Sequence, residues 1–156
     1  MKIVLLLTGI SDDKELAPAI ERYTKRLVHY SAFEAEEIRC PKQFAKLGQD
    51  ELRKEEGRLI LERLSPQDFV VVLDERGKHF TSVDFANQLQ KWMNAGTKRI
   101  VFVVGGAFGF SDEVYQRADF KMALSSLTLT HQMVRLFFVE QLYRAFSILR
   151  NEKYHH

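Results

Sequence analysis

Residues 100–110, Ile-Val-Phe-Val-Val-Gly-Gly-Ala-Phe-Gly-Phe, carry the clearest structural signal in this chain. The apolar half is typical of a strand that is buried on both faces, and the glycines lie where such a strand should end. Because Gly105, Gly106 and Gly109 lack a Cβ atom, the backbone there can turn sharply and approach a ligand closely. A short glycine motif can equally serve only to turn the chain, so both interpretations stay open on this stretch alone.

A second apolar segment ends in a loop rich in hydroxyl groups. Residues 123–131 read Ala-Leu-Ser-Ser-Leu-Thr-Leu-Thr-His. If this loop lies beside the glycine turn, the two would form a pocket lined by backbone, hydroxyl and leucine groups.

Strand-like apolar runs alternate with amphipathic helical patterns along the whole chain, which predicts an α/β fold. Continuous apolar runs favour a mostly parallel sheet that is covered by helices on both faces. With 156 residues, the chain is expected to form one domain over 1–156. The expected strands are Lys2–Leu7, Phe33–Arg39, Phe69–Leu73, Arg99–Val104 and Met122–Leu127. The expected helices are Asp12–Tyr30 after a possible N-cap at Ser11, then Leu47–Leu64, Ser82–Asn94 and Gln132–Arg150.

The composition excludes several classes of protein and site. Cys40 is the only cysteine, so an intrachain disulfide and a cysteine-based zinc cluster are both impossible. We expect no metal, because no histidine or acidic group has the spacing of metal ligands. Dinucleotide-binding, P-loop and Gly-x-Ser-x-Gly hydrolase motifs are missing too. No apolar run reaches about 18 residues, so we expect no membrane partner and a cytoplasmic location.

Positive charge is concentrated toward the end of the chain. The net charge is +2, but residues 117–156 carry six Lys and Arg against three Asp and Glu. This distribution suggests an anionic partner such as nucleic acid, and ordinary solvated charge explains it equally well.

The last expected helix has apolar residues on more than one of its faces. Its large apolar side chains are Met133, Val134, Leu136, Phe137, Phe138, Val139, Leu142, Phe146, Ile148 and Leu149. A surface helix needs an apolar stripe of about 100°, and the sheet of a small domain covers one side only. Leaving such side chains in water would forgo about 1.5–3 kcal/mol each, so we expect a homodimer formed through this helix. The alternative is a central helix that its own domain covers.

Five ordered motifs resemble the ribosomal RNA large subunit methyltransferase H family, which belongs to the SPOUT class of knotted methyltransferases. The resemblance runs the length of the chain, from the first strand to the last residues. The motifs are Leu-Asp-Glu-Arg-Gly-Lys at 73–78, Val-Gly-Gly-Ala-Phe-Gly at 104–109, Leu-Ser-Ser-Leu-Thr-Leu-Thr-His-Gln at 124–132, Glu-Gln-Leu-Tyr-Arg-Ala at 140–145 and Tyr154-His155.

This resemblance implies a SPOUT-like fold with a C-terminal trefoil knot. It also implies a homodimer that transfers a methyl group from S-adenosylmethionine to N3 of a pseudouridine in 23S ribosomal RNA of the assembled ribosome. Strand-end backbone groups would bind the adenine, and leucine side chains would flank its face. The cofactor-binding residues implied by the motifs are Leu73, Gly105, Leu124, Ser125, Ser126, Leu127, Thr128 and Leu129.

Methylation of an imide nitrogen requires precise positioning and removal of the N3 proton. Histidine has the most suitable pKa, so His131 and His155 are the candidate catalytic groups. His131 could equally be a helix cap or a dimer contact. The resemblance favours Tyr154 and His155, which could stack on the splayed base and reach its imide edge.

Two arginines of the last helix, Arg135 and Arg144, are candidates for binding RNA phosphate. Arg144 could instead pair with Glu140, which lies four residues earlier on the same helix.

Two other functions stay open at this point. One is a SPOUT methyltransferase that acts on transfer RNA or on a different ribosomal nucleotide, because the chemistry would be shared. The other is a non-catalytic RNA-binding or ribosome-assembly module that keeps the pocket by descent.

Overall fold

The sheet of this protein is parallel throughout the residues that its computed structural model describes, which are 1–10 and 12–155. Its strands follow the order β2-β1-β4-β3-β5. The prediction of an α/β fold with a mostly parallel sheet is confirmed. The strands are β1 (Lys2–Thr8), β2 (Ala32–Ile38), β3 (Phe69–His79), β4 (Arg99–Val104) and β5 (Phe120–Ala123).

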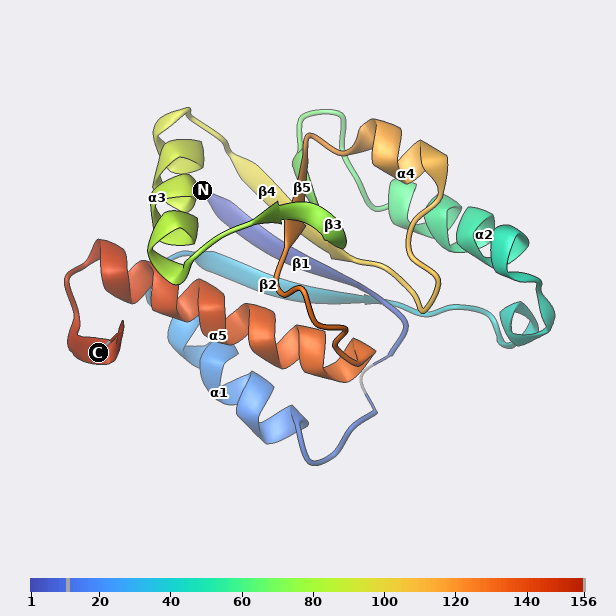
Figure 1. The fold of residues 1–156 in the computed structure, drawn as a ribbon, viewed down its shortest axis with the longest axis horizontal. Helices are drawn as coiled ribbons and strands as arrows, with labels where there is room; N and C mark the ends of the chain where they lie inside the picture. The colour runs from blue at the N-terminus through green and yellow to red at the C-terminus, as the bar shows by residue number, and fades with distance from the viewer. Residues whose placement is uncertain (11, 156) are drawn as a thin grey trace.

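Helices cover both faces of the sheet, as Figure 1 shows. On one face lie α1 (Ala17–Leu27), α3 (Ser82–Asn94) and α5 (His131–Leu149). On the other lie α2 (Gln49–Leu61) and α4 (Asp112–Arg117), while the short 3-10 turns η1 (Lys42–Lys46) and η2 (Lys153–His155) lie outside the sheet. This coverage explains the unbroken apolar sequence of β1, because every β1 residue after Lys2 is buried.

Several element boundaries differ from the sequence predictions. The first helix begins at Ala17 rather than Asp12, because Pro18 is tolerated in a first helical turn and not in the interior. The proposed cap at Ser11 lies outside the described residues. The last strand is Phe120–Ala123, so the predicted extension to Leu127 is wrong, and helix α4 was not predicted.

Strand β3 is longer than predicted because it pairs with β5 in two registers. The register shifts between Leu73 and Lys78. Gly77 lies in this irregular segment, where a Cβ atom would come within 2.6 Å of the Met122 backbone. Only glycine therefore lets the two strands approach this closely.

Helix α5 packs on the sheet between α1 and α3. The rings of Phe138 on α5 and Phe102 on β4 lie 4.7 Å apart, centroid to centroid. The domain therefore covers much of the apolar surface of α5, as the alternative to self-association required. Met133 nevertheless stays 39% exposed, and the homodimer stays a prediction. Among the described residues, no helix combines the length and the apolar character that crossing a membrane requires.

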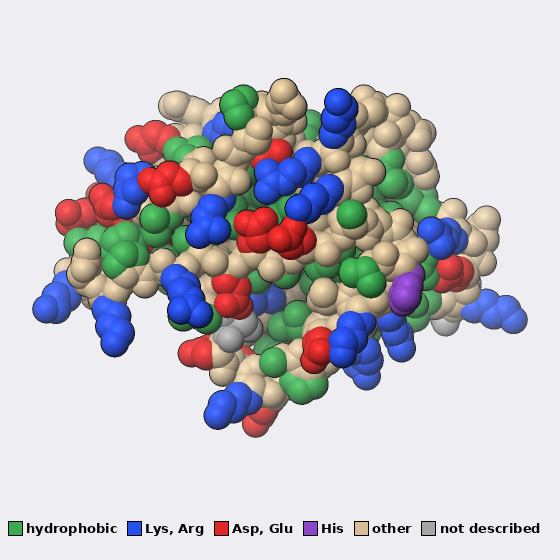
Figure 2. Space-filling view, turned by 180° about the vertical axis from the view of Figure 1, so that it is seen from behind, with side chains coloured by type: hydrophobic (Ala, Val, Ile, Leu, Met, Phe, Trp, Pro, Cys, Tyr) green, Lys and Arg blue, Asp and Glu red, His purple; other side chains and the backbone are tan. Residues whose placement is uncertain are grey.

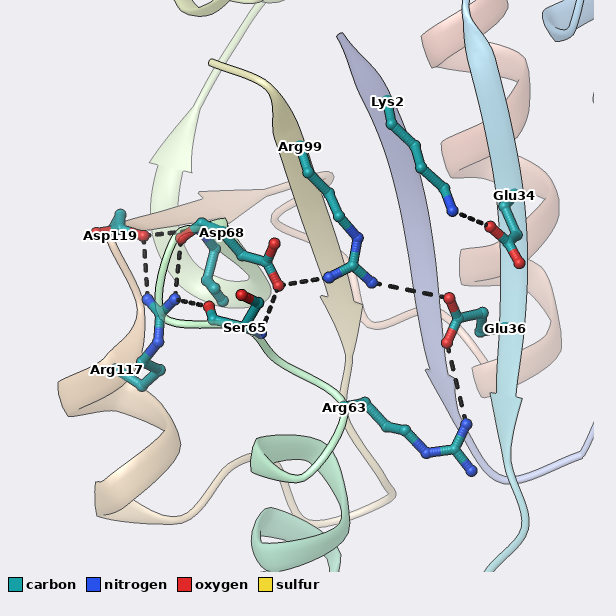
Figure 3. Close-up of polar contacts among 10 residues, drawn as sticks. Lys2, Glu34, Glu36, Arg63, Ser65, Asp68, Arg99, Arg117 and Asp119 are labelled. Atoms are coloured by element: carbon teal, nitrogen blue, oxygen red, sulfur yellow. Dashed lines mark hydrogen bonds and ion pairs between the residues drawn. The ribbon is translucent and has the colours of Figure 1, made fainter.

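Ion pairs cover the part of the sheet that α2 and α4 leave open. Figure 2 shows this face with Lys and Arg interspersed among Asp and Glu, and Figure 3 shows the contacts. Lys2 lies 2.5 Å from Glu34, and Arg99 lies 2.5 Å from the buried carboxylate of Asp68. Lys2 and Arg99 lie at the N-terminal ends of their strands, so this network stabilises the edge of the sheet opposite to the one where parallel sheets bind ligands.

Candidate active site

A cavity of about 490 Å³ opens where β4 and β5 end, beside the middle of β3. The carboxyl edge of a parallel sheet is where such folds bind ligands, and the volume suits a small molecule. Both sequence motifs that predicted a pocket contribute to it. The cavity is lined by Leu73, Asp74, Glu75, Arg76, Val104, Gly105, Gly106, Ala107, Phe108, Gly109, Phe110, Tyr115, Leu124, Ser125, Leu127, Thr128, Leu129, His131 and Val134.

Most of the predicted cofactor residues meet at this cavity. They are Leu73, Gly105, Leu124, Ser125, Leu127, Thr128 and Leu129. Ser126 belongs to the same loop but is not among the lining residues. The Leu127 side chain is 78% exposed, and its N–H donates to Ser125 Oγ at 2.9 Å. An exposed leucine at the mouth of a cavity is available to contact an apolar ligand face.

The glycine loop needs its glycines for separate reasons. Gly109 has φ +82°, a backbone conformation that favours glycine, and its N–H donates to the Gly106 carbonyl at 3.2 Å. A Cβ atom on Gly105 would lie 3.0 Å from the Phe110 ring, which lines the same cavity. Gly109 therefore allows the loop to turn, and Gly105 allows the loop to pack closely against Phe110.

A hydrogen-bonded acid lies at one wall of the cavity. Asp74 accepts from the Tyr115 hydroxyl and from the Arg76 backbone N–H, the latter at 2.8 Å. Arg76 also donates to the Tyr115 oxygen at 2.8 Å. Burial opposes ionisation of Asp74, but these hydrogen bonds outweigh it and hold the pKa of the carboxyl below its usual value. This wall therefore presents a fixed carboxylate beside a fixed guanidinium.

His131 is held by a buried arginine at the start of α5. Its Nε2 lies 3.0 Å from Nη2 of Arg135, and a guanidinium only donates, so Nε2 accepts. Burial and the neighbouring Arg135 charge lower the pKa of His131, although hydrogen bonding to the backbone of Thr8 and Gly105 partly opposes them. His131 is therefore neutral near pH 7, and its Nε2 lone pair is occupied. This geometry fits a positioning group better than a proton acceptor.

Arg135 does not lie where a phosphate-binding residue should. Its side chain is 1% exposed, and it donates to Glu37 Oε1 at 3.0 Å and to the Gly9 carbonyl at 2.9 Å. The expected contact with RNA phosphate conflicts with this burial, because Nη1 and Nη2 already donate to protein acceptors and the guanidinium is closed off from solvent. Arg135 instead ties α5 to the ends of β1 and β2.

Arg144 pairs with Glu140, as the sequence allowed. Its Nε donates to Glu140 Oε1 at 3.1 Å. The Arg144 guanidinium also lies 4.9 Å from the centroid of the Tyr154 ring. The proposed RNA contact of Arg144 stays a prediction.

The C-terminal tail lies at the opposite end of α5 from the cavity (Figure 1). The Tyr154 hydroxyl lies 2.9 Å from that of Tyr23 and donates to Glu140 Oε1 at 3.1 Å. Tyr154 is therefore packed against α1 and α5 of its own chain, and η2, which includes His155, packs on α5 rather than beside the cofactor loops.

Several cavity residues were not selected from the sequence. Asp74 and Arg76 lie in a quoted motif, directly after an apolar strand, and that position was a usable signal. Tyr115 lies on the unpredicted helix α4, and no sequence pattern pairs it with Asp74. Within the described residues, no group of three or more His, Cys, Asp or Glu is arranged to hold a metal ion.

Comparison with known proteins gives a consistent result. Residues 1–155 match the family model described as "Predicted SPOUT methyltransferase". Proteins named ribosomal RNA large subunit methyltransferase H are 53% identical in Christiangramia forsetii and 51% identical in Flavobacterium psychrophilum, over all of this chain and 99% of each relative. A protein of the same name from Cytophaga hutchinsonii is 50% identical over the full length of both. The chain therefore belongs to the SPOUT methyltransferase family.

Proposed function

We propose that this protein transfers a methyl group from S-adenosylmethionine to N3 of a pseudouridine in 23S ribosomal RNA of the assembled ribosome. The observation that carries the proposal is the cavity at the carboxyl edge of the sheet, bounded by both predicted loops in a SPOUT methyltransferase. The names of the full-length relatives support a large-subunit ribosomal RNA as the substrate. Action on ribosomes would place the enzyme in the cytoplasm.

The residues of the cavity suit S-adenosylmethionine, which supplies an electrophilic methyl group on a sulfonium. Leu73, Leu124 and Leu129 offer apolar surface for an adenine ring. Gly105 has no side chain of its own and lines the cavity beside the Phe110 ring, so a ligand can approach its backbone closely. Asp74 lines the same cavity and suits a ligand that carries positive charge.

The protein contributes positioning and proton removal. Arg135 fixes His131 at the start of α5, and His131 in turn contacts the backbone of Gly105. This contact holds α5 against the glycine loop, so the cofactor and the base can be aligned. Since the Nε2 lone pair of His131 already accepts a hydrogen bond from Arg135, His155 is the better candidate to accept the N3 proton.

A homodimer would bring the tail to the cavity. With 19 residues, α5 is about 28 Å long, and the tail and the cavity lie at its two ends. Two α5 helices packed antiparallel across a two-fold axis would place the tail of each protomer beside the cavity of the other. Met133 and the half-buried Phe137 lie on the outward part of α5 that such packing would cover.

A transfer assay tests the proposal. Radiolabelled S-adenosylmethionine is added to the protein with ribosomes that lack the modification, with naked 23S ribosomal RNA, or with transfer RNA. Label should enter the ribosomal sample, and light scattering should give twice the chain mass of 18.2 kDa. Label in transfer RNA alone would favour a different SPOUT activity. Calorimetry without any heat from S-adenosylmethionine would favour a non-catalytic module.

A further inference from the structure

Glu56 on α2 is a buried carboxyl group directly behind the glycine loop. Glu56 is 9% exposed, and it is not among the residues that line the cavity. A Cβ atom built on Gly106 would lie 2.3 Å from Oε2 and 2.6 Å from Oε1 of Glu56. The carboxyl therefore packs against the α-carbon of Gly106, while Gly106 itself lines the cavity. Gly106 therefore lies between the Glu56 carboxyl and the cavity.

The fold does not compensate the charge of Glu56. Within the described part of the chain, buried Oε2 has no hydrogen-bond partner. Burial raises the pKa of this carboxyl, because an unpaired carboxylate is costly in such surroundings. The Cys40 thiol faces the same group, and its pKa is raised by burial and by the Glu56 charge. Among residues 1–10 and 12–155, nothing forms an ion pair with this buried carboxyl, which lies beside a loop that would bind a cation.

We propose that Glu56 is a positioning residue that couples the glycine loop to ligand charge, so that the site favours a cationic sulfonium donor over its neutral thioether product. Without ligand, burial and the missing hydrogen-bond partner of Oε2 favour the protonated, neutral carboxyl. A cation on the other side of Gly106 stabilises the carboxylate, and the carboxyl proton passes to solvent. When the methyl group has left, the sulfur is neutral, and Glu56 takes a proton back from solvent. The product is then held less tightly than the donor was.

This inference rests on the proposed function, since it assumes that S-adenosylmethionine occupies the cavity. Other ionisable groups also face the ligand. They are Asp74, Glu75, Arg76, Tyr115 and His131 on the cavity side. Substitution of Glu56 alone separates its contribution from theirs. Glu55 provides a matched control, because this neighbouring glutamate is solvent-accessible and pairs with Arg58.

The experiment is calorimetry with S-adenosylmethionine and with S-adenosylhomocysteine, between pH 5 and 8, in two buffers of different ionisation enthalpy. In the native protein, donor binding should release protons and product binding should not, and the preference for the donor should grow as pH rises. Glu56→Gln should abolish this proton release and reduce the donor preference by about 5-fold or more at high pH. Glu55→Gln should behave as the native protein does.

The outcomes separate this inference from the proposed function. If the native protein binds neither ligand, both proposals are overturned. If it binds both and the donor preference is the same in Glu56→Gln at every pH, only the role of Glu56 is wrong. Equal weakening of both ligands would also overturn it, because that is the signature of a purely structural group. If Glu56→Gln fails to fold, the native protein still tests the proposal, because donor binding without any proton release between pH 5 and 8 would overturn the role of Glu56.

Discussion

Replacement of Gly105 by valine tests the packing of the cofactor loop. The first added carbon would lie 3.0 Å from Cε1 and 3.1 Å from Cζ of Phe110, closer than the ordinary contact distance of 3.4 Å or more. Phe110 is only 6% exposed and packs edge-on against Tyr115, with 5.6 Å between ring centroids. The ring therefore has to shift by several tenths of an ångström, and the two further carbons of valine add to the overlap.

We expect Gly105→Val to lower the free energy of unfolding by about 1–3 kcal/mol, the usual cost of overpacking a core. We also expect affinity for S-adenosylmethionine to fall by about tenfold or more, because the displaced Phe110 ring lines the cavity. Urea unfolding measures the first effect, and calorimetry measures the second.

Two controls sharpen this experiment. Gly48→Ala places a Cβ atom where nothing lies within 4 Å, so cofactor affinity should not change. Phe110→Leu added to Gly105→Val should restore part of the lost stability. If Gly105→Val bound S-adenosylmethionine within about twofold of the native affinity, Gly105 would be only a turn residue and the assigned packing would be wrong.

Three further predictions concern α5 and the tail. Arg135→Met should lower the free energy of unfolding by about 2–4 kcal/mol in a denaturant titration, somewhat less than the loss of a fully buried pair, because Glu37 is 34% exposed. Arg135→Lys should lose only part of this stability. A loss below about 1 kcal/mol for Arg135→Met would argue against a stabilising role of the Arg135 hydrogen bonds. The pKa of His131 in the folded protein is lowered from 6.5, so the free energy of unfolding should fall as the pH drops below about 6.5. The slope should be at most about 1.4 kcal/mol per pH unit, and His131→Gln should make it smaller. Deleting residues 154–156 removes the Tyr154 contacts and should cost about 1–2 kcal/mol. The same truncation should leave cofactor affinity unchanged and slow single-turnover methyl transfer by about 10²–10⁴-fold, whereas near-native turnover would remove the tail from the active site.

The strands were the most predictable part of the fold. Apolar runs such as Ile100–Val104 can be buried only between two layers, and every residue of this run is buried in the structure. The glycines after this strand could be assigned to a ligand loop because a second loop of suitable chemistry occurs later in the chain. Helix α4 was missed because its six residues, Asp112–Arg117, are too few to show an amphipathic period.

Burial of charged groups was the least predictable feature of the site. On a helix, Arg135 looks like a surface cation, and only the tertiary structure brings Glu37 and the Gly9 carbonyl to it. Glu56 likewise lies in a strongly charged helix, where nothing in the sequence distinguishes it from Glu55. The trefoil knot implied by the family also stays a prediction, because periodicity carries no information on threading.

The most direct measurement is the position of the transferred methyl group. Ribosomes that lack the modification are incubated with the protein and S-adenosylmethionine, and nucleosides from their 23S ribosomal RNA are analysed by mass spectrometry. We expect a single new nucleoside, a pseudouridine methylated at N3, which the protein lacking residues 154–156 forms far more slowly. Methylation at another nucleotide, or none under conditions where S-adenosylmethionine binds, would contradict the proposed function.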